Sequence, residues 1–259
     1  LNETLPAMTV EAELTHPQKV RSIINKTLIG LGLNETVSYS LVSPKLSEMF
    51  KVLFDDSYAP IKLLHPMTEE HSILRRSLVP SLLDIVKYNN ARKNYNLSVY
   101  EISLQYGLTE NEPNEHYVLS GAMQGVHSSN EWQGKKEVVD FYYVKGILDT
   151  VFTKVGAQVK YRPLSKECAE LHPGRSAEIV LNDKVIGFVG EVHPTFVKQN
   201  DIEPTYVFEV LLEPLFEVES KETQKKNRKQ EDVEIVEEAK KRRGRTRKNT
   251  VVPATKKES

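Results

Sequence analysis

Cysteine and long apolar runs are scarce in this sequence. Cys168 is the only cysteine among 259 residues, so no disulfide can form within the chain, which fits a reducing compartment. No apolar run approaches the roughly 20 residues that a membrane-spanning helix needs. The first residues lack the basic and apolar segments of a secretory signal. We therefore expect a cytoplasmic protein that does not associate with a membrane.

The common motifs of nucleotide and metal chemistry are also missing. The sequence contains no P-loop, no GxGxxG that opens a helix, no HExxH and no CxxC pair. Seven histidines are scattered, and no two have the i, i+4 spacing that sets two imidazoles on one metal ion. Four of them precede proline, which is typical of a turn with a locally bonded imidazole. We predict that the chain itself binds neither a metal nor a cofactor.

Charge is distributed unevenly along the chain. The formal net charge is −1, but residues 219–259 contain 14 Lys/Arg and 8 Asp/Glu and no aromatic residue. This composition predicts a disordered charged tail over residues 218–259. The run from Lys240 to Lys248 could bind RNA phosphates. It lacks interleaved aromatic side chains for base stacking, so a solvated tail without a specific ligand is the favoured interpretation.

The hydrophobic periodicity predicts an α+β fold. Apolar residues at helical spacing indicate helices over 17–31, 80–93, 140–156 and 194–200. Alternation with Thr, Val and Tyr indicates a strand over 35–42. Further short runs indicate strands over 59–66, which prolines bound, and over 71–77, 97–107, 116–126, 157–164 and 205–212. Residues 176–194 form a predicted hairpin that turns at Asn182 and Asp183, two residue types that tolerate positive φ. Because strands often follow one another directly, we expect a mainly antiparallel sheet with helices on it.

Two arginines are adjacent in "HSILRRS". Neighbouring residues on a strand face opposite sides of the sheet. We therefore expect only one of Arg75 and Arg76 to point into any pocket, where it could hold phosphate, and the other to be a surface charge.

Two further places could contact an anion or a partner. In "ELHPGRSAEI" a tight turn is expected at Pro173-Gly174, with His172 and Arg175 beside it. Either these two side chains contact an anion or a partner, or, as we favour, Arg175 pairs with a neighbouring carboxylate. Trp132 lies in a polar loop before a helix and is either an interface anchor or a lid over its own helix.

Five segments, taken in order, resemble a known family. They are "HPQKVRSIINKTLIGLGLNETVSYSLVSP", "HSILRRSLVPSLLDIVKYNNARKNYNLSVYEISLQYG", "VVDFYYVKGILDTVF", "HPGRSAEI" and "VIGFVGEVHP". Together they look like the catalytic-like core of the beta subunit of bacterial phenylalanine–tRNA ligase. The resemblance implies a class II synthetase-like antiparallel sheet flanked by helices over residues 15–217. It implies that residues 1–14 are a remnant of the preceding B5-like module or linker, and it covers no N-terminal tRNA-binding, editing or anticodon-binding domain.

The resemblance also locates a degenerate ATP site. Class II synthetases end their second motif in Phe-Arg-x-Glu; in "VYEISLQYGLTE" Tyr106 takes the aromatic place, Gly107 the arginine place and Thr109 the glutamate place. The third motif, "IGFVGEVHPTFVK", has two glycines and no arginine. Adenylate formation depends on cations that neutralise phosphate charge. The resemblance therefore implies that this chain does not activate phenylalanine.

What remains is a structural role. The resemblance implies a partner of the catalytic alpha subunit in an alpha2 beta2 ligase that charges tRNA-Phe, with ATP and magnesium bound by the holoenzyme. The helices Pro17–Leu31 and Asp140–Val155 are then expected at the interface. The alternative is a free-standing synthetase-like protein that binds RNA or a small ligand. An amino-acid ligase with an altered site is disfavoured by the loss of both arginines.

Overall fold

The computed structural model describes four stretches of the chain, residues 12–53, 58–110, 112–166 and 168–218. The predicted charged tail from Glu219 onward and the first eleven residues lie outside the described residues. The expectations for both ends therefore stay predictions.

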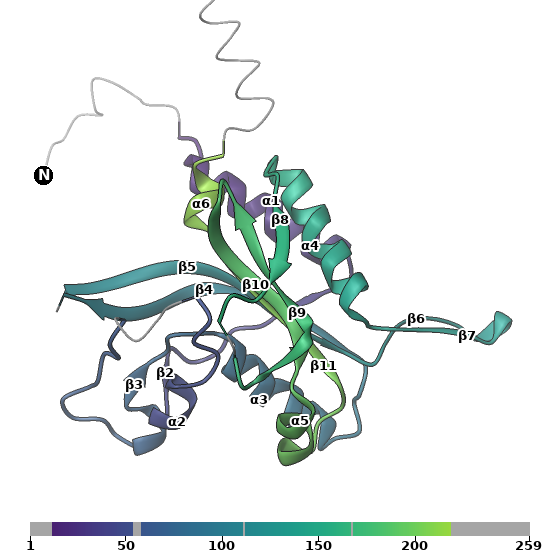
Figure 1. The fold of residues 1–259 in the computed structure, drawn as a ribbon, viewed down its shortest axis with the longest axis horizontal. Coiled ribbons are helices and arrows are strands. Elements are labelled where there is room, and N and C mark those ends of the chain that lie inside the picture. Colours follow the sequence, from purple (N-terminus) through teal and green to yellow (C-terminus); the bar gives the residue numbers. More distant parts are fainter. Residues whose placement is uncertain (1–11, 54–57, 111, 167, 219–259) are drawn as a thin grey trace, which may run out of the picture. The chain divides into compact units, whose positions relative to one another are not determined.

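Strands dominate the described stretches (Figure 1). They are β1 (Asn34–Glu35), β2 (Leu41–Val42), β3 (Ile73–Leu74), β4 (Leu97–Thr109), β5 (Glu112–Gln124), β6 (Val126–Asn130), β7 (Lys135–Val138), β8 (Lys160–Pro163), β9 (Leu171–Leu181), β10 (Lys184–Val192) and β11 (Thr205–Leu211). A seven-stranded sheet has the order β1-β4-β5-β11-β10-β9-β8. Within it the β1–β4 pair is parallel and the other pairs are antiparallel, which confirms the expected mainly antiparallel α+β arrangement.

Helices cover both faces of this sheet. They are α1 (His16–Gly30), α2 (Pro44–Ser47), α3 (Val79–Asn90), α4 (Phe141–Val155), α5 (Pro194–Asn200) and α6 (Glu213–Phe216), with short 3-10 turns η1 (Glu69–His71) and η2 (Glu131–Gln133). All four predicted helices are confirmed within a few residues at their ends. None of the helices in the described stretches is long and apolar enough to cross a membrane.

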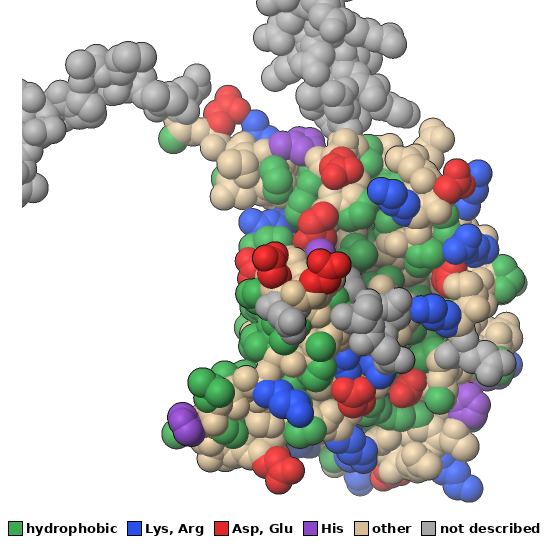
Figure 2. All heavy atoms as spheres, turned by 60° about the vertical axis from the view of Figure 1, so that its left-hand side comes forward, with side chains coloured by type: hydrophobic (Ala, Val, Ile, Leu, Met, Phe, Trp, Pro, Cys, Tyr) green, Lys and Arg blue, Asp and Glu red, His purple; other side chains and the backbone are tan. Residues whose placement is uncertain are grey.

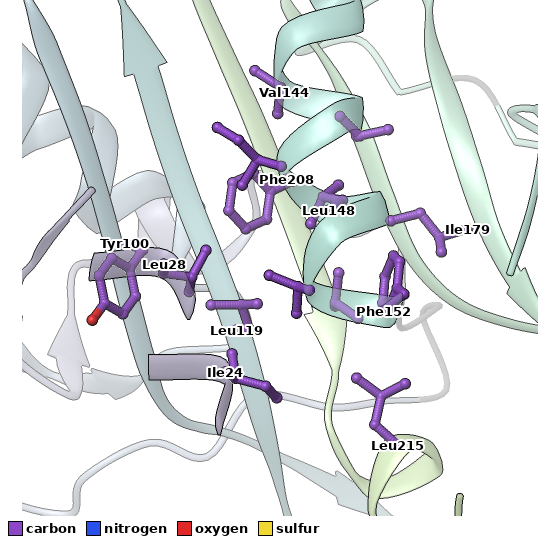
Figure 3. Packing of buried hydrophobic residues seen from close by; sticks show 14 of the residues in the cluster. Ile24, Leu28, Tyr100, Leu119, Val144, Leu148, Phe152, Ile179, Phe208 and Leu215 are labelled. Atoms are coloured by element: carbon purple, nitrogen blue, oxygen red, sulfur yellow. The ribbon is translucent and has the colours of Figure 1, made fainter. Parts of the chain in front are cut away.

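One apolar layer lies between the sheet and the helices α1, α4 and α6. Figure 3 shows Ile24 and Leu28 of α1 beside Tyr100 and Leu119, and the residues of α4 next to Phe208. A second layer on the opposite face packs α3 and α5 against Val99, Phe188 and Val207. Because the strands carry buried residues on both faces, strict alternation of polar and apolar side chains fails in the centre of the sheet.

Helix α1 ends in a Schellman motif, with Leu31 as the C-cap. The N–H of Leu33 donates to the Leu28 carbonyl at 3.1 Å and that of Gly32 to the Ile29 carbonyl at 3.0 Å. Gly32 has φ +87°, a conformation that a side chain disfavours. The motif turns the chain directly into β1, so this glycine sets the direction in which the sheet edge begins.

Two glycines at this helix end should respond oppositely to alanine. Gly32→Ala strains a left-handed backbone and should lower the free energy of unfolding by about 1 kcal/mol. Gly30→Ala places a methyl group where nothing lies within 4 Å and should raise it by about 0.5–1 kcal/mol, because alanine favours the helix. Urea denaturation of both variants measures this difference. A stabilising Gly32→Ala variant would contradict the assignment.

Four predicted strands are shorter than expected or absent. Of the 157–164 prediction, only Lys160–Pro163 forms a strand. The 35–42 prediction is wrong in its middle, because the Ser38 N–H donates to the Glu101 carboxylate at 3.2 Å instead of to a strand carbonyl. The 59–66 prediction is wrong: only isolated bridges form there, Ala59 with Leu108 and Lys62 with Ile73, and its prolines cannot donate to a ladder. In 71–77 the strand ends at Leu74.

The connections around the later strands also differ in part from prediction. The hairpin turn at Asn182 and Asp183 is confirmed, with φ values of 49° and 63°. The predicted tight turn at Pro173-Gly174 is wrong, since both residues lie within β9, where the register against β10 shifts between Gly190 and Val192. The polar loop predicted around Trp132 is instead a β6–β7 hairpin.

Candidate functional site

Gly107, which takes the arginine place of the second motif in the resemblance, has no room for a side chain. Gly107 lies on β4, and a Cβ placed on it would lie 2.1 Å from two ring carbons of Tyr58. The Tyr58 side chain is buried. Its ring therefore occupies the space into which any side chain at Gly107 would extend. An arginine fits here only if Tyr58 moves away, so packing explains the glycine.

Tyr58 is held in this position from both ends. Its hydroxyl donates to the Asn114 carbonyl at 3.2 Å, and its own carbonyl accepts from Arg76 Nη1 at 2.9 Å. Burial, and secondarily Glu213, raises the pKa of Tyr58 to about 12. The phenol thus stays neutral, and remains a donor, throughout the physiological range.

The two other aligned positions do not complete a nucleotide site either. Tyr106 is half-buried, and its N–H donates to the Arg75 carbonyl at 2.9 Å. Thr109 is exposed at the end of β4, just before the turn into β5. The three positions therefore serve packing, backbone pairing and the strand end, and none of them supplies a cation.

Gly107→Ala should destabilise the chain because its methyl group meets the Tyr58 ring. Overpacking of this kind costs about 1–3 kcal/mol in the free energy of unfolding. Gly146→Ala is the matched control, since a Cβ at this α4 position meets nothing within 4 Å, and a helical alanine should be neutral or slightly stabilising. Equal stabilities of the two variants in urea denaturation would show that Tyr58 does not block the position.

Arg75 is a buried structural cation. Its guanidinium donates to Glu101 Oε1 at 2.9 Å, to Ser38 Oγ at 2.7 Å and to the Leu104 carbonyl at 3.0 Å, and also to the Ser103 hydroxyl. The chain's own acceptors thus surround it. A phosphate would have to compete with these acceptors for the guanidinium of Arg75.

Arg76 is buried as well, which corrects the expectation that one of the two arginines is a surface charge. It donates to the carbonyls of Ser47 at 3.1 Å and Tyr58 at 2.9 Å and to Glu48 at 2.5 Å. The chain leaves the strand after Leu74, so the rule of opposite faces no longer applies. Arg76 instead hydrogen-bonds the end of α2, at Ser47 and Glu48, and Tyr58.

A row of buried polar residues crosses the centre of the same sheet face. Glu101, Ser120 and Glu209 stand side by side on β4, β5 and β11. Further buried polar members are Gln105, Gln124 and Thr205. We call these six residues the polar face. The clearest sign of it in the sequence is Glu209, a glutamate between apolar residues in "VFEVLL".

Glu209 connects this face to the start of α3. Its Oε2 accepts from the Ser120 hydroxyl at 2.7 Å, the Leu78 N–H at 2.8 Å and the Ser77 hydroxyl at 3.0 Å. Burial raises the pKa of this carboxyl in spite of these hydrogen bonds. At the other end of α3, Asn90 and Gln124 bond through their amides. The helix therefore covers the polar face and closes it.

The raised pKa of Glu209 predicts a pH-dependent stability. A carboxyl with a higher pKa in the folded than in the unfolded state stabilises less as pH rises above its unfolded value. The Glu209→Gln variant lacks this titration, so its free energy of unfolding relative to wild type should increase between pH 5 and pH 8. Urea titrations at both values measure the difference. A difference that does not change, or that falls with pH, would contradict the raised pKa.

One member of the polar face has no partner within the described part of the chain. Gln105 is fully buried, and neither its Nε2 nor its Oε1 makes a hydrogen bond there. Such an amide carries a desolvation cost of about 1–3 kcal/mol. On β4 it lies between Glu101 and Ser103, which bind Arg75, and Gly107.

The two glycines of the third motif also have no room for a side chain. A Cβ on Gly187 would lie 2.5 Å from the Glu209 carbonyl oxygen, and one on Gly190 would lie 2.7 Å from the Ser176 Cβ. Both glycines of β10 are thus explained by neighbouring strands. The following helix α5 contains Lys198 but no arginine.

The candidates of the "HPGRS" segment are bonded locally. Arg175 Nη1 donates to Glu191 Oε2 at 2.7 Å, and Tyr206 donates to the same oxygen at 3.2 Å. His172 Nδ1 accepts from the Gly174 N–H at 3.1 Å. Arg175 therefore pairs with a neighbouring carboxylate, as favoured from sequence. Whether it or His172 contacts an anion or a partner stays a prediction.

Trp132 takes no part in these contacts. It is 96% exposed at the tip of the β6–β7 hairpin, which rules out a lid over its own helix. The interface alternative for this residue stays a prediction. Among the residues that the structure describes, no three His, Cys, Asp or Glu side chains are grouped to hold a metal ion.

Comparisons with known proteins identify relatives of the whole described unit. The family model of the phenylalanyl tRNA synthetase beta chain CLM domain matches residues 1–212. The phenylalanine–tRNA ligase beta subunit of Staphylococcus epidermidis is 44% identical over 219 residues, which are 83% of this chain and 27% of that protein. The corresponding proteins of Geobacillus kaustophilus and Bacillus cereus are 42% identical, over 84% and 85% of this chain. The chain spans little more than a quarter of the length of these curated relatives.

Proposed function

Because the chain belongs to the family of the phenylalanine–tRNA ligase beta subunit, we propose that it is the non-catalytic, class II synthetase-like core of that subunit. In this proposal it is the structural partner of the catalytic alpha subunit in an alpha2 beta2 enzyme that charges tRNA-Phe in the cytoplasm. ATP and magnesium are bound by the holoenzyme, through the alpha subunit.

The observation that carries this proposal is the position of the Tyr58 ring over Gly107. A working adenylation site needs a cation at this point of the strand to neutralise the α-phosphate. Here the space is filled by an aromatic ring, and Arg75 nearby is committed to Glu101. Loss of one electrostatic group of this kind typically costs about 10²–10³ in rate, and the third motif adds a second loss.

The surface of the chain suggests where an alpha subunit would bind. The wide apolar faces of α1 and α4, expected at the interface, pack largely against the chain's own sheet. The outer side of α1 still exposes Ile23 and Ile29, and the sheet edge after β1 exposes 90% of Val37 and 79% of Tyr39. Exposed apolar groups along one edge are typical of a subunit contact. We therefore place the interface on the outer side of α1 and on residues 36–40.

The alternative, a free-standing RNA-binding protein, finds less support in the described residues. Basic and acidic side chains are interspersed over the face drawn in Figure 2. Binding to phosphates needs a basic patch or stripe. The sequence as a whole has a net charge of −1, and its basic run lies outside the described residues.

Pyrophosphate exchange tests the proposed function. The purified chain alone should not catalyse phenylalanine-dependent ATP–pyrophosphate exchange, because no cation meets the α-phosphate. Mixed with the alpha subunit, it should co-elute with that subunit in size-exclusion chromatography, and exchange should accompany the complex. Robust exchange by the chain alone would overturn the proposal. Absence of a complex, together with salt-sensitive RNA binding that is lost on removal of residues 219–259, would favour the alternative.

A further inference from the structure

The β6–β7 hairpin forms an arm that projects from the sheet (Figure 1). The arm consists of residues 126–138. Val126 pairs with Val138 at its base, and Asn130 pairs with Lys135 near its tip. All four residues of β7 are exposed. A two-stranded ribbon is marginally stable in water when it stands alone. An arm of this kind therefore gains stability if a second surface holds it.

The base of the arm is fixed. The His127 ring stacks on the Tyr143 ring of α4, with centroids 3.7 Å apart and planes 16° apart. The Val139 N–H donates to the Gly125 carbonyl at 2.9 Å, and the Asp140 carboxylate caps α4 through the Tyr143 N–H at 2.7 Å. The direction of the arm is thus set by the same residues that begin α4.

A pocket of about 580 Å³ lies beside this base, between the start of α4 and the strands β8 and β9. Its lining includes Phe141, Tyr142, Tyr161, Pro163, Arg175 and Tyr206. The volume lies in the range of pockets that bind a ligand group, and an aromatic lining with a few polar groups is typical of them. Tyr142 is 77% exposed at its rim.

Arg175 supplies the polar end of this pocket. Its contact with Glu191, a buried carboxylate, fixes the guanidinium, yet the side chain remains 58% exposed. Such a group can donate a further hydrogen bond to an outside carbonyl or carboxylate at little additional ordering cost. The pocket therefore combines apolar walls with one oriented donor.

Charge decides between a protein and a nucleic acid as the occupant. The described side chains of the arm and the pocket include four basic ones, Lys135, Lys136, Arg162 and Arg175, and two acidic ones, Glu137 and Asp140. Two more acidic side chains pair with the pocket arginines, Glu178 with Arg162 and Glu191 with Arg175. The count is thus four basic and four acidic side chains. A nucleic-acid surface needs an excess of positive charge. A balanced surface with an exposed tryptophan fits a protein partner, since tryptophan is enriched among the residues that dominate such interfaces.

We propose that the arm and the pocket at its base form one docking surface for a segment of the alpha subunit. Trp132 inserts into an apolar depression of that subunit, while an aromatic or aliphatic side chain of the segment fills the pocket and a carbonyl or carboxylate next to it meets Arg175. This surface is separate from the one on α1 and residues 36–40. The inference rests on the proposed function, because the partner is the alpha subunit.

A fluorine label isolates the tip of the arm. Trp132 is the only tryptophan of the chain, so growth with 5-fluorotryptophan gives a single ¹⁹F resonance. In the free chain this resonance should change between H₂O and D₂O, because the ring is exposed. Addition of unlabelled alpha subunit should shift the resonance and remove its response to D₂O.

Matched variants test the surface by affinity. Trp132→Ala and Tyr142→Ala should each weaken binding of the alpha subunit by roughly 10- to 30-fold, the effect of losing an interface residue that dominates binding. Tyr88→Ala is the control, because Tyr88 is also an exposed aromatic residue but lies on α3, on the opposite side of the sheet. It should bind as wild type does. All three sites are exposed, and melting curves check that the variants fold.

Each outcome decides the inference. A stable complex in which the Trp132 resonance is unchanged, or in which all three variants bind equally, overturns the docking surface and leaves the proposed function standing. Absence of any complex overturns both. A resonance shift produced by tRNA-Phe alone, or by raising the concentration of the chain alone, also overturns the inference, because the occupant is then a nucleic acid or a second copy of the chain.

Discussion

The structure depends on one buried ion pair, between Arg75 and Glu101. It ties three segments together: the chain after β1 through Ser38, the turn before α3, and the centre of β4. Removing one partner of such a pair typically costs about 3–5 kcal/mol, a large part of the 5–15 kcal/mol of a typical domain. A cation in this position therefore serves folding, and it is not available for substrate.

Neighbouring contacts of this face are equally internal. Arg76 donates to the carbonyls of Ser47 and Tyr58, and the Tyr58 ring lies over Gly107. The start of α3 then lies on Glu209. The space beside Gly107 and the donors of Arg75 are thus taken up by the chain itself, which supports the non-catalytic role proposed above.

Sequence reasoning succeeded where the signal is local. The apolar spacing of α1, α3 and α4 and the turn at Asn182 and Asp183 depend on neighbouring residues, and these elements were predicted. The buried polar groups were missed because their partners are distant: Glu101 lies 26 residues from Arg75, and Ser120 lies 89 residues from Glu209. The β6–β7 arm was missed because its residues do not alternate between polar and apolar, since in the described part of the chain all four residues of β7 are exposed.

The packing of Tyr58 over Gly107 couples the residue types that positions 58 and 107 can hold. An arginine that returned to position 107 would meet the Tyr58 ring, while a smaller residue at position 58 would leave a hole above the glycine. Arg75 would still be held by Glu101. The residues at positions 58 and 107 therefore fit only as a pair, so that a change at one of them calls for a compensating change at the other.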